Sequence, residues 1–423
     1  MSDVIKTKRT FSGKTTPLHK LCFSITDCHH STPIWSESGK IVVRNFNIKN
    51  GKLDLGSISY TDDETFQERT LRAKPEAGDL IVTREAPMGE VCVIPDGVEC
   101  CLGQRMVLIK PNPEKIGSKY LLYAMLSEFV QKQINQSDKT GSIVSNLRIP
   151  LLKELEIPLI DKSEEIAVVL SALDAKIDCN NRMNSELEAM AKTLYGYWFV
   201  QFDFPDCNGK PYKSSGGKMV YSTMLKRAIP CGWEDSSILA VADLLGGGTP
   251  TKKRAEYWGG DIPFFTPTDA DGESFKFSTA DYITVEGLKG SSTKLFGKHT
   301  VFITARGSVG KLTLAGVDMA MNQSCYALRA KSGISHTFLF LLAKELIHHL
   351  QVKSSGSVFD SIVSNDIELT KLAIPTVDVI EKFAAVVEPA FEKISNNIKE
   401  NLQLAQLRDW LLPMLMNGQV TVA

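Results

Sequence analysis

Two stretches decide the fold of this chain: residues 166–187, IAVVLSALDAKIDCNNRMNSEL, and residues 383–404, FAAVVEPAFEKISNNIKENLQL. The second repeats the first 217 residues later, and the residues that match include a Lys-Ile pair and two asparagines four positions apart. In both stretches apolar residues and these asparagines recur in alternating steps of four and three, which is the spacing of a heptad seam. The pattern predicts two long helices of about five heptads, each on the order of 55 Å long.

The seam extends beyond the quoted residues in both copies. In the first helix its members are Ile166, Leu170, Leu173, Ile177, Asn180, Asn184, Leu187, Ala191 and Leu194. In the second helix they are Phe383, Val387, Ala390, Ile394, Asn397, Asn401, Leu404, Arg408 and Leu411. One such stripe alone fits a helix packed on its own domain equally well, but two matching stripes favour pairing of the helices.

The asparagines predict how the helices pair. An antiparallel arrangement sets Asn184 opposite Asn397 and Asn180 opposite Asn401. A slipped register would leave these amides facing leucine, so buried asparagines fix the register at some expense of stability.

Two positions depart from the seam pattern. The same register sets Leu173 opposite Arg408, which is a poorer match. Pro389 stands where the first copy has Ala172, and we expect it to kink the second helix or to mark its first turn.

The rest of the chain is duplicated as well. The matching segments are Thr32-Pro33 and Thr249-Pro250, residues 78–84 and 297–306, Gln104 and Gln323, residues 143–146 and 362–365, and Ile157-Pro158 and Ile374-Pro375. A series of matches in the same order at nearly one offset indicates two copies of one module, each followed by a long helix. Within this series we expect Arg84 and Arg306 to occupy equivalent turns.

Each module mixes strands and helices. Short apolar runs predict strands at 40–43, 79–83 and 90–94 in the first copy, and at 262–265, 300–304 and 311–315 in the second. Residues 120–128 and 336–350 are expected to be helical. Residues 202–226 are rich in Gly, Pro, Ser and Lys and are expected to form a linker. The fold class predicted is α+β.

The composition is that of an ordinary soluble globular protein, with 423 residues, 43% hydrophobic residues, 23% charged residues and a net charge of −1. No apolar run reaches the roughly 18 residues of a membrane span, and the N-terminus lacks an apolar signal core. We therefore expect a cytoplasmic protein without a membrane partner. The near-zero net charge argues against a simple electrostatic nucleic-acid binder, which is usually basic.

Metal and catalytic motifs are missing. None of the nine cysteines forms a Cys-x-x-Cys pair, so reduced, mostly buried thiols are expected and no metal site is predicted. Residues 307–311 resemble a phosphate loop, but the glycine spacing is too short and Leu312 replaces the required Ser or Thr. Residues 246–248 do not form a dinucleotide fingerprint, and no Asn-Pro-Pro-aromatic motif or Gly-x-Ser-x-Gly elbow occurs. The chain is predicted to be non-catalytic and to bind no cofactor itself.

Polar loops at matching places suggest contacts with a polyanion. The turns at Arg84 and Arg306 put a guanidinium beside glycines, which suits backbone contact or bidentate reading of guanine. Segments 137–142 and 354–357 carry hydroxyls and glycines that suit phosphate contacts. Taken alone, such stretches are more often plain loops, and the basic run 252–254 is more often solvated surface.

Four motifs together are typical of one protein family. They are Tyr257-Trp258-Gly259-Gly260-Asp261-Ile262-Pro263 after Gly248-Thr249-Pro250, Ala305-Arg306-Gly307-Ser308-Val309-Gly310, Leu170-Ser171-Ala172-Leu173-Asp174-Ala175-Lys176-Ile177, and the segment Gly209 to Gly217. With them the sequence resembles the specificity (S) subunit of type I restriction–modification systems, from about Leu18 to Gly418.

The resemblance implies two pseudo-twofold-related target-recognition domains, joined by two long helices that form an antiparallel coiled coil. Each domain is expected to read one half of a split, asymmetric sequence in double-stranded DNA. Two methyltransferase (M) subunits that carry S-adenosylmethionine are expected to dock on the helices. Restriction (R) subunits that use ATP and Mg²⁺ are expected in systems that possess them.

The expected segments are a first recognition domain at 1–158, a first helix at 159–200, a linker at 201–231, a second recognition domain at 232–376, and a second helix with the C-terminal tail at 377–423. The residues predicted to contact DNA are Thr32, Arg44, Arg84, Lys139, Ser142, Thr249, Lys252, Arg254, Thr266, Arg306, Ser308, Asn322 and Ser355.

Two other functions are compatible with the same residues. One is a coiled-coil scaffold whose modules bind proteins, and the other is a fused DNA methyltransferase or nuclease with an unrecognised motif. Methyl transfer by the isolated chain would favour the enzyme, and flat affinity over random duplexes would favour the scaffold.

Overall fold

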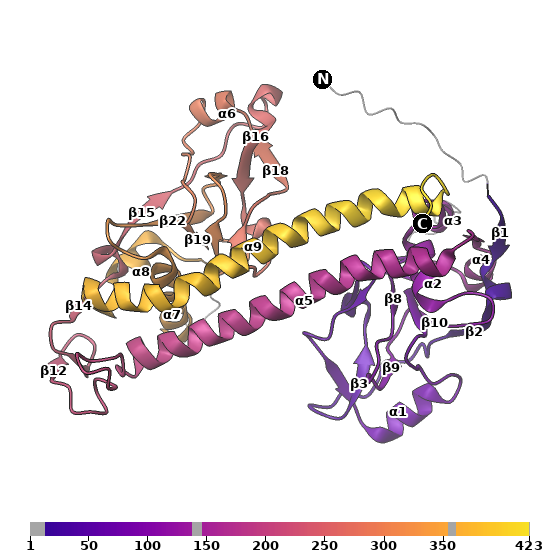
Figure 1. Cartoon of the computed structure of the whole chain (residues 1–423), viewed down its shortest axis with the longest axis horizontal. Helices are drawn as coiled ribbons and strands as arrows, with labels where there is room; N and C mark the ends of the chain where they lie inside the picture. The colour runs from indigo at the N-terminus through magenta and orange to yellow at the C-terminus, as the bar shows by residue number, and fades with distance from the viewer. Residues whose placement is uncertain (1–12, 138–145, 354–360, 423) are drawn as a thin grey trace. The chain divides into compact units, whose positions relative to one another are not determined.

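A computed structural model describes residues 13–137, 146–353 and 361–422 of the chain. It divides into two compact units (Figure 1). Unit 1 comprises residues 1–177 and 403–423, and unit 2 comprises residues 178–402. Two long helices, α5 (Ser163–Tyr195) and α9 (Val377–Met416), each contribute one part to each unit.

The main sheet of unit 1 is antiparallel, in the order β2-β10-β7-β8. Its strands are β2 (Cys22–Asp27), β10 (Met106–Pro111), β7 (Leu80–Thr83) and β8 (Val91–Val93). All four residues of β7 are buried, and successive side chains point to opposite faces. Leu80 and Val82 therefore pack with the helices α2 (Ser118–Leu126) and α3 (Glu128–Ser137), whereas Ile81 belongs to a second core cluster.

A smaller sheet adjoins this second cluster, in the order β6-β3-β9. Its strands are β6 (Ser59–Thr61), β3 (Lys40–Val43) and β9 (Cys100–Leu102), with β3 antiparallel to β6 and parallel to β9. Helix α1 (Asp63–Thr70) follows β6, and the Asp62 carboxylate caps it by accepting from the Thr65 N–H at 2.7 Å. The remaining elements of unit 1 are β1 (Thr15–Pro17), β4 (Ile48–Lys49), β5 (Lys52–Leu53), α4 (Ile149–Lys153) and β11 (Glu156–Pro158).

Unit 2 repeats the strand orders of unit 1 and adds one strand, β17, at the edge of the main sheet. Its main sheet has the order β15-β22-β19-β20-β17, and its smaller sheet β18-β16-β21 again combines one antiparallel and one parallel pair. The main strands are β15 (Ala242–Gly246), β22 (Cys325–Ala330), β19 (Val301–Thr304), β20 (Leu312–Ala315) and β17 (Phe275–Lys276). The smaller sheet comprises β18 (Asp281–Ile283), β16 (Trp258–Phe265) and β21 (Ala320–Met321).

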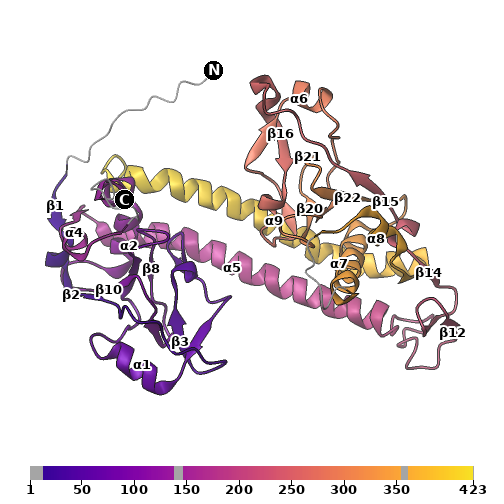
Figure 2. The same cartoon turned by 180° about the vertical axis from the view of Figure 1, so that it is seen from behind.

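Three helices and the strand pair of β14 (Glu234–Ser236) and β23 (Leu372–Ile374) also belong to unit 2. Helix α7 (His336–Lys353) packs on the main sheet, because its phenylalanines and leucines share a core cluster with Val301, Ile303 and Leu314 (Figure 2). The other two helices are α6 (Val285–Lys289) and α8 (Ser364–Leu369). The strands and helices expected from the sequence are confirmed, with ends that differ by up to four residues.

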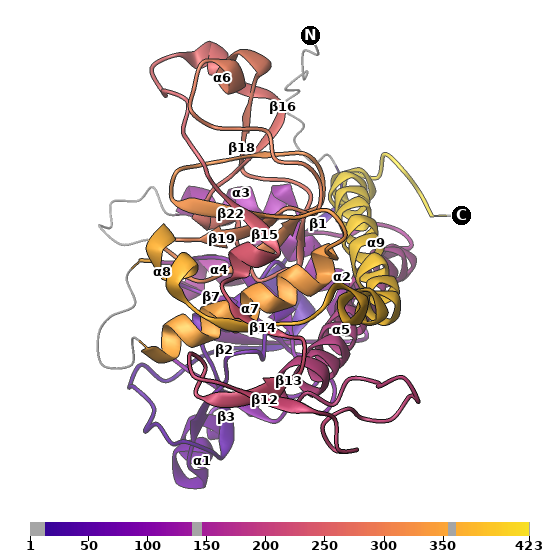
Figure 3. The same ribbon diagram turned by 90° about the vertical axis from the view of Figure 1, so that its left-hand side faces the viewer.

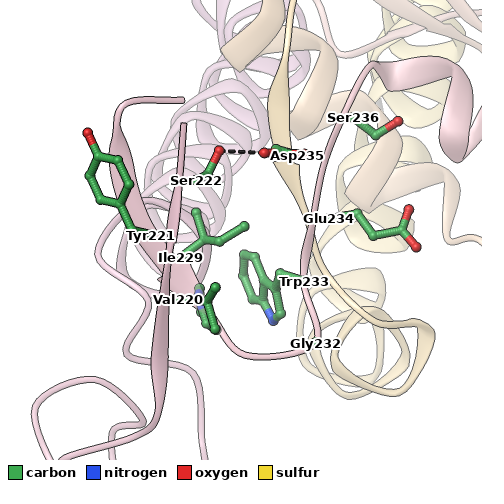
Figure 4. A pocket seen from close by; sticks show the side chains of 10 residues that line it. Val220, Tyr221, Ser222, Ile229, Gly232, Trp233, Glu234, Asp235 and Ser236 are labelled. Carbon is green, nitrogen blue, oxygen red and sulfur yellow. Dashed lines mark hydrogen bonds between the residues drawn. The ribbon is translucent and has the colours of Figure 1, made fainter. Parts of the chain in front are cut away.

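The segment expected to be a linker is folded instead. It contains a hairpin of β12 (Met219–Ser222) and β13 (Arg227–Pro230), visible in Figure 3. Phe202 and Phe204 are buried in the core of unit 2, and the Phe204 ring stacks on Trp233 with centroids 5.3 Å apart. An open cavity of about 450 Å³ lies between the hairpin and β14, where the Ser222 hydroxyl donates to Asp235 (Figure 4).

The asparagine register is confirmed within unit 2. The Asn397 Nδ2 donates to Asn184 Oδ1 at 2.8 Å, and the Asn180 Nδ2 donates to Asn401 Oδ1 at 2.9 Å. The partner residue on α9 falls from 401 to 397 as the residue on α5 rises from 180 to 184, so these segments are antiparallel. Asn180 and Asn397 are almost completely buried.

The poor match at Arg408 is resolved within unit 1. The Arg408 guanidinium donates at 2.7 Å to Asp174, the neighbour of Leu173 in sequence, and Asp174 also accepts from the Tyr123 hydroxyl. Helix α9 runs without interruption through Pro389, so the proposal that this proline marks the first turn is wrong. Within the described residues no helix is long and apolar enough to cross a membrane.

Candidate nucleic-acid interface

Each unit carries a polar edge where the same two chain segments meet. In unit 1 the Gly103 N–H donates to Val43 O at 2.8 Å, which ties the turn after β9 to the end of β3. In unit 2 the Asn322 N–H donates to Phe265 O at 3.0 Å, which ties the turn after β21 to the end of β16. These hydrogen bonds make Arg44 and Thr266 equivalent, since each is the first residue after its strand.

A second contact confirms the match of Thr32 with Thr249 and of Gln104 with Gln323. In unit 1 the Gln104 amide donates to the Thr32 hydroxyl at 3.4 Å. In unit 2 the Thr249 hydroxyl donates to the Gln323 carboxamide oxygen. Each threonine is exposed, so each unit presents a threonine and a glutamine side by side at this edge.

In unit 1 this edge lines an open cavity of about 360 Å³. The Arg44 guanidinium packs on two aromatic rings there, 5.1 Å from the Trp35 centroid and 4.7 Å from that of Phe46. Both residues are more than 40% exposed, so the two rings lie at the surface. Cation–π contacts of this kind restrain an arginine and place it on the wall of the cavity.

Arg105 is a second arginine of the same cavity. Its backbone has φ +64°, a left-handed conformation that is uncommon for residues other than glycine. Its Nε forms an ion pair with Glu85 at 3.1 Å, and 56% of its side chain is exposed. No spacing in the sequence pointed to this residue.

Buried Arg69 connects the two backbone segments that form this edge in unit 1. Its guanidinium donates to the backbone carbonyls of Leu102, Gly103 and Ser31, at 2.9 to 3.1 Å. Burial is the main cause that lowers the pKa of Arg69 from its ordinary value. Arg69 thereby fixes the backbone next to Thr32 and Arg105. The sequence did not point to this residue.

In unit 2 the equivalent edge carries hydroxyl and amide groups at Thr266, Asn322 and Ser324 instead of the two arginines. Thr266 begins a short 3₁₀ turn, where its N–H and hydroxyl both donate to Asp269 at 2.8 and 2.7 Å. The Asn322 carboxamide oxygen accepts from the Ser324 N–H at 3.0 Å. The edge also requires glycine, because a Cβ on Gly247 would lie 2.1 Å from the Asn322 carbonyl oxygen.

The basic run of unit 2 is held by aromatic side chains. Lys252 Nζ lies 5.9 Å from the Trp258 ring centroid, and the Arg254 guanidinium lies 5.3 Å from that of Tyr257. Arg254 also donates to the Tyr257 hydroxyl at 2.7 Å. Lys252 and Arg254 are exposed, so they remain available to a ligand.

Arg84 and Arg306 lie in equivalent turns, as expected, but they do not occupy the same position within them. The Gly89 N–H donates to Thr83 O, and the Gly310 N–H donates to Thr304 O, so the two threonines are equivalent. Arg84 directly follows Thr83, whereas Arg306 is the second residue after Thr304. Aligning the two arginines hides this offset of one residue, which the backbone hydrogen bonds define.

The two arginines accordingly differ in surroundings. Arg84 donates to Asp27 at 3.0 Å, to Asn146 at 3.2 Å and to the Leu147 carbonyl at 3.0 Å, and only 13% of its side chain is exposed. This network gives Arg84 a structural role in unit 1. Arg306 and Ser308 are exposed at the turn after β19. Lys139, Ser142 and Ser355 lie outside the described residues.

Among the described residues, histidines, cysteines and carboxylates are side chains that could hold a metal or act as nucleophiles. No three His, Cys, Asp or Glu residues among them are placed to hold a metal. All nine cysteines are free thiols. Burial raises the pKa of Cys92 and Cys100 to about 12, which keeps these thiols protonated near neutral pH and unreactive as nucleophiles.

Comparison with known proteins agrees with this picture. The family model described as "Type I restriction modification DNA specificity domain" matches residues 33–189 and again residues 230–404. The specificity subunit of the type I restriction enzyme MjaIX of Methanocaldococcus jannaschii is 27% identical over 368 residues, which cover 85% of this chain and 81% of that protein. The HindI specificity subunit of Haemophilus influenzae is 22% identical over 370 residues, with 75% and 80% covered.

The fold agrees with a solved structure as well. A type I restriction–modification S subunit from M. genitalium superposes with a TM-score of 0.55 at 16% identity and covers 95% of both chains. The two family matches fall on the two duplicated copies, and together they span most of the sequence. The chain therefore belongs to the type I restriction–modification DNA specificity family, with two copies of its domain.

Proposed function

We propose that this chain is the DNA-specificity subunit of a type I restriction–modification complex, and that each unit reads one half of a split target. The observation that carries the proposal is the polar edge that occurs twice. In both units the same strand order and the same Thr–Gln contact build it, but the side chains around it differ. A duplicated scaffold with different side chains suits two half-sites of different sequence.

The paired helices support a further part of the proposal. We infer that α5 and α9 form an antiparallel coiled coil about a pseudo-twofold axis, which sets the distance between the two reading edges. Half-sites one helical turn apart would lie about 10 bp from centre to centre, with unread base pairs between them. The antiparallel asparagine pairs and the repeated strand order support this arrangement.

In this proposal the chain supplies recognition, and its partners supply the chemistry. Two methyltransferase subunits would dock on the helices and bring S-adenosylmethionine for adenine N6-methylation. Restriction subunits, where the system has them, would bring ATP and Mg²⁺. The relatives named above are specificity subunits of type I restriction enzymes, which supports a non-catalytic role for this chain.

Genome-wide mapping of methylated adenines tests the proposal. The chain is expressed with its methyltransferase partner in a host without adenine methylation, and each subunit is also expressed alone. We expect one bipartite, asymmetric motif, and only when both subunits are present. Methyl transfer by this chain alone would contradict the proposal, and methylation without sequence preference would favour the scaffold alternative.

A further inference from the structure

We propose that three positions at each polar edge select bases, and that unit 1 uses them to select guanine. The positions are 44, 103 and 105 in unit 1 and 266, 322 and 324 in unit 2. The inference rests on the proposed function and adds the residues and the base to it.

Backbone hydrogen bonds define these positions independently of side-chain identity. Gly103 and Asn322 are equivalent because each N–H donates to the last residue of the neighbouring strand, as described above. Arg105 and Ser324 are equivalent because their carbonyls accept from the N–H groups of Arg84 and Ala305, both at 2.8 Å. The two units therefore hold different side chains at the same three points of one scaffold.

Unit 1 presents two guanidinium groups at these points. Arg44 is restrained by the Trp35 and Phe46 rings, which bind it without supplying a hydrogen-bond acceptor for its N–H groups. Arg105 is exposed and its Nε is paired with Glu85. Both line the same cavity, and Gly103 between them leaves its wall without a side chain.

The chemistry of this cavity fits the major-groove edge of guanine. A guanidinium donates two parallel hydrogen bonds, and guanine offers O6 and N7 as two neighbouring acceptors. Adenine presents a donor at N6, which would face the N–H donors of the arginine and form no hydrogen bond with them. A restrained arginine loses little side-chain entropy when it binds, which favours base reading over a mobile contact with phosphate.

Unit 2 has no guanidinium at the three points. Thr266, Asn322 and Ser324 offer hydroxyls and an amide, and the Thr266 hydroxyl is already bonded to Asp269. Unit 2 therefore selects other bases through these positions. The contrast between the units predicts that only one half of the target depends on Arg44.

The test compares methylated motifs of variants produced with the methyltransferase partner. Arg44→Lys keeps the charge but loses the rigid planar fork of the guanidinium, and Arg44→Thr installs the residue of unit 2. Arg72→Thr is the matched control, since Arg72 is an exposed arginine of unit 1 outside this cavity. Circular dichroism and gel filtration of the complex check folding and assembly.

We expect both Arg44 variants to accept other bases at one guanine of one half-site, with discrimination reduced on the order of 10- to 100-fold. The other half-site and the Arg72→Thr motif should stay unchanged. If Arg44→Thr does not fold, Arg44→Lys alone decides the question.

Three results would overturn the inference while leaving the proposed function intact. The first is a parent motif without guanine, and the second is an Arg44→Lys motif identical to that of the parent. The third is an Arg44 variant that loses affinity uniformly over all sequences, with a salt dependence reduced by about one phosphate contact. If the parent complex shows no motif at all, the proposed function itself fails.

Discussion

Replacement of Asn184 by leucine tests whether the asparagine pairs hold α5 and α9 in register. Asn397 is 1% exposed, and its Nδ2 donates to Asn184 Oδ1 at 2.8 Å and to the Met183 sulfur at 3.4 Å. Within the described part of the chain its own Oδ1 has no partner. Asn184→Leu leaves the Asn397 amide with the sulfur alone, and water cannot reach it to compensate.

The magnitude follows from the penalty for a buried polar group that loses its partner. That penalty is about 1–3 kcal/mol, so the free energy of unfolding should fall by this amount. For a folding unit of the size of unit 2, residues 178–402, a change of 1 kcal/mol shifts the melting temperature by about 2–4 °C. The double variant Asn184→Leu/Asn397→Leu removes both amides and should return to the stability of the parent or exceed it, because two apolar side chains then face each other.

Differential scanning calorimetry measures the melting temperatures, and hydrogen exchange of peptides from 178–195 and 391–402 reports the local opening of the two helices. Asn396→Leu is the control, since Asn396 is the exposed neighbour of Asn397 on α9. A double-mutant cycle should give a coupling energy of about 1–3 kcal/mol. Equal effects of Asn184→Leu and Asn396→Leu, or a double variant equal to the sum of the single ones, would refute the reasoning.

Three further predictions concern stability. Burial is the main cause that lowers the pKa of His299 to about 4, so the unfolded chain binds more protons than the folded chain between pH 6.5 and 4. The melting temperature should therefore fall as the pH drops through this window. His299→Asn should reduce this dependence of the melting temperature on pH. Gly247→Ala would place a Cβ 2.1 Å from a backbone carbonyl oxygen, so the free energy of unfolding measured by urea titration should fall by about 1–3 kcal/mol. Gly246→Ala is the control, because a Cβ there has no other atom within 4 Å, and it should leave the free energy of unfolding unchanged. Arg408→Met removes the partly buried ion pair with Asp174 and should cost about 1–3 kcal/mol, with faster hydrogen exchange in residues 403–416 and no change in α7.

The sequence was most informative where a pattern is local or repeated. The heptad spacing predicted both long helices, because side chains three and four residues apart share one face of a helix. The asparagine register could be predicted from two residues in each helix, since a mismatched buried amide is penalised in every other register. The repeated order of matching segments predicted the repeated strand order, although it did not show the offset of one residue between Arg84 and Arg306.

The polar edges could be predicted only in part. Thr32 and Thr249 were identified by identity between the copies, whereas Arg69 and Arg105 carried no signal in the sequence. Arg69 acts through carbonyls more than 30 residues away, and such contacts depend on how loops fold back rather than on spacing along the chain. The composition of residues 202–226 also misled, because a few aromatic side chains outweigh many glycines and serines once a core exists to receive them.

The amino-acid sequence by itself determined that this protein is a duplication, that its two long helices pair antiparallel, and which family it resembles. These features follow from periodicity and from identity between copies, which can be followed along the chain. The tertiary structure alone decided which residues of the two copies are equivalent and which side chains meet at the polar edges. The physical reason is that backbone hydrogen bonds and buried contacts between distant segments set the position of each loop. An offset of one residue in such a loop separates the exposed guanidinium of Arg306 from the half-buried one of Arg84.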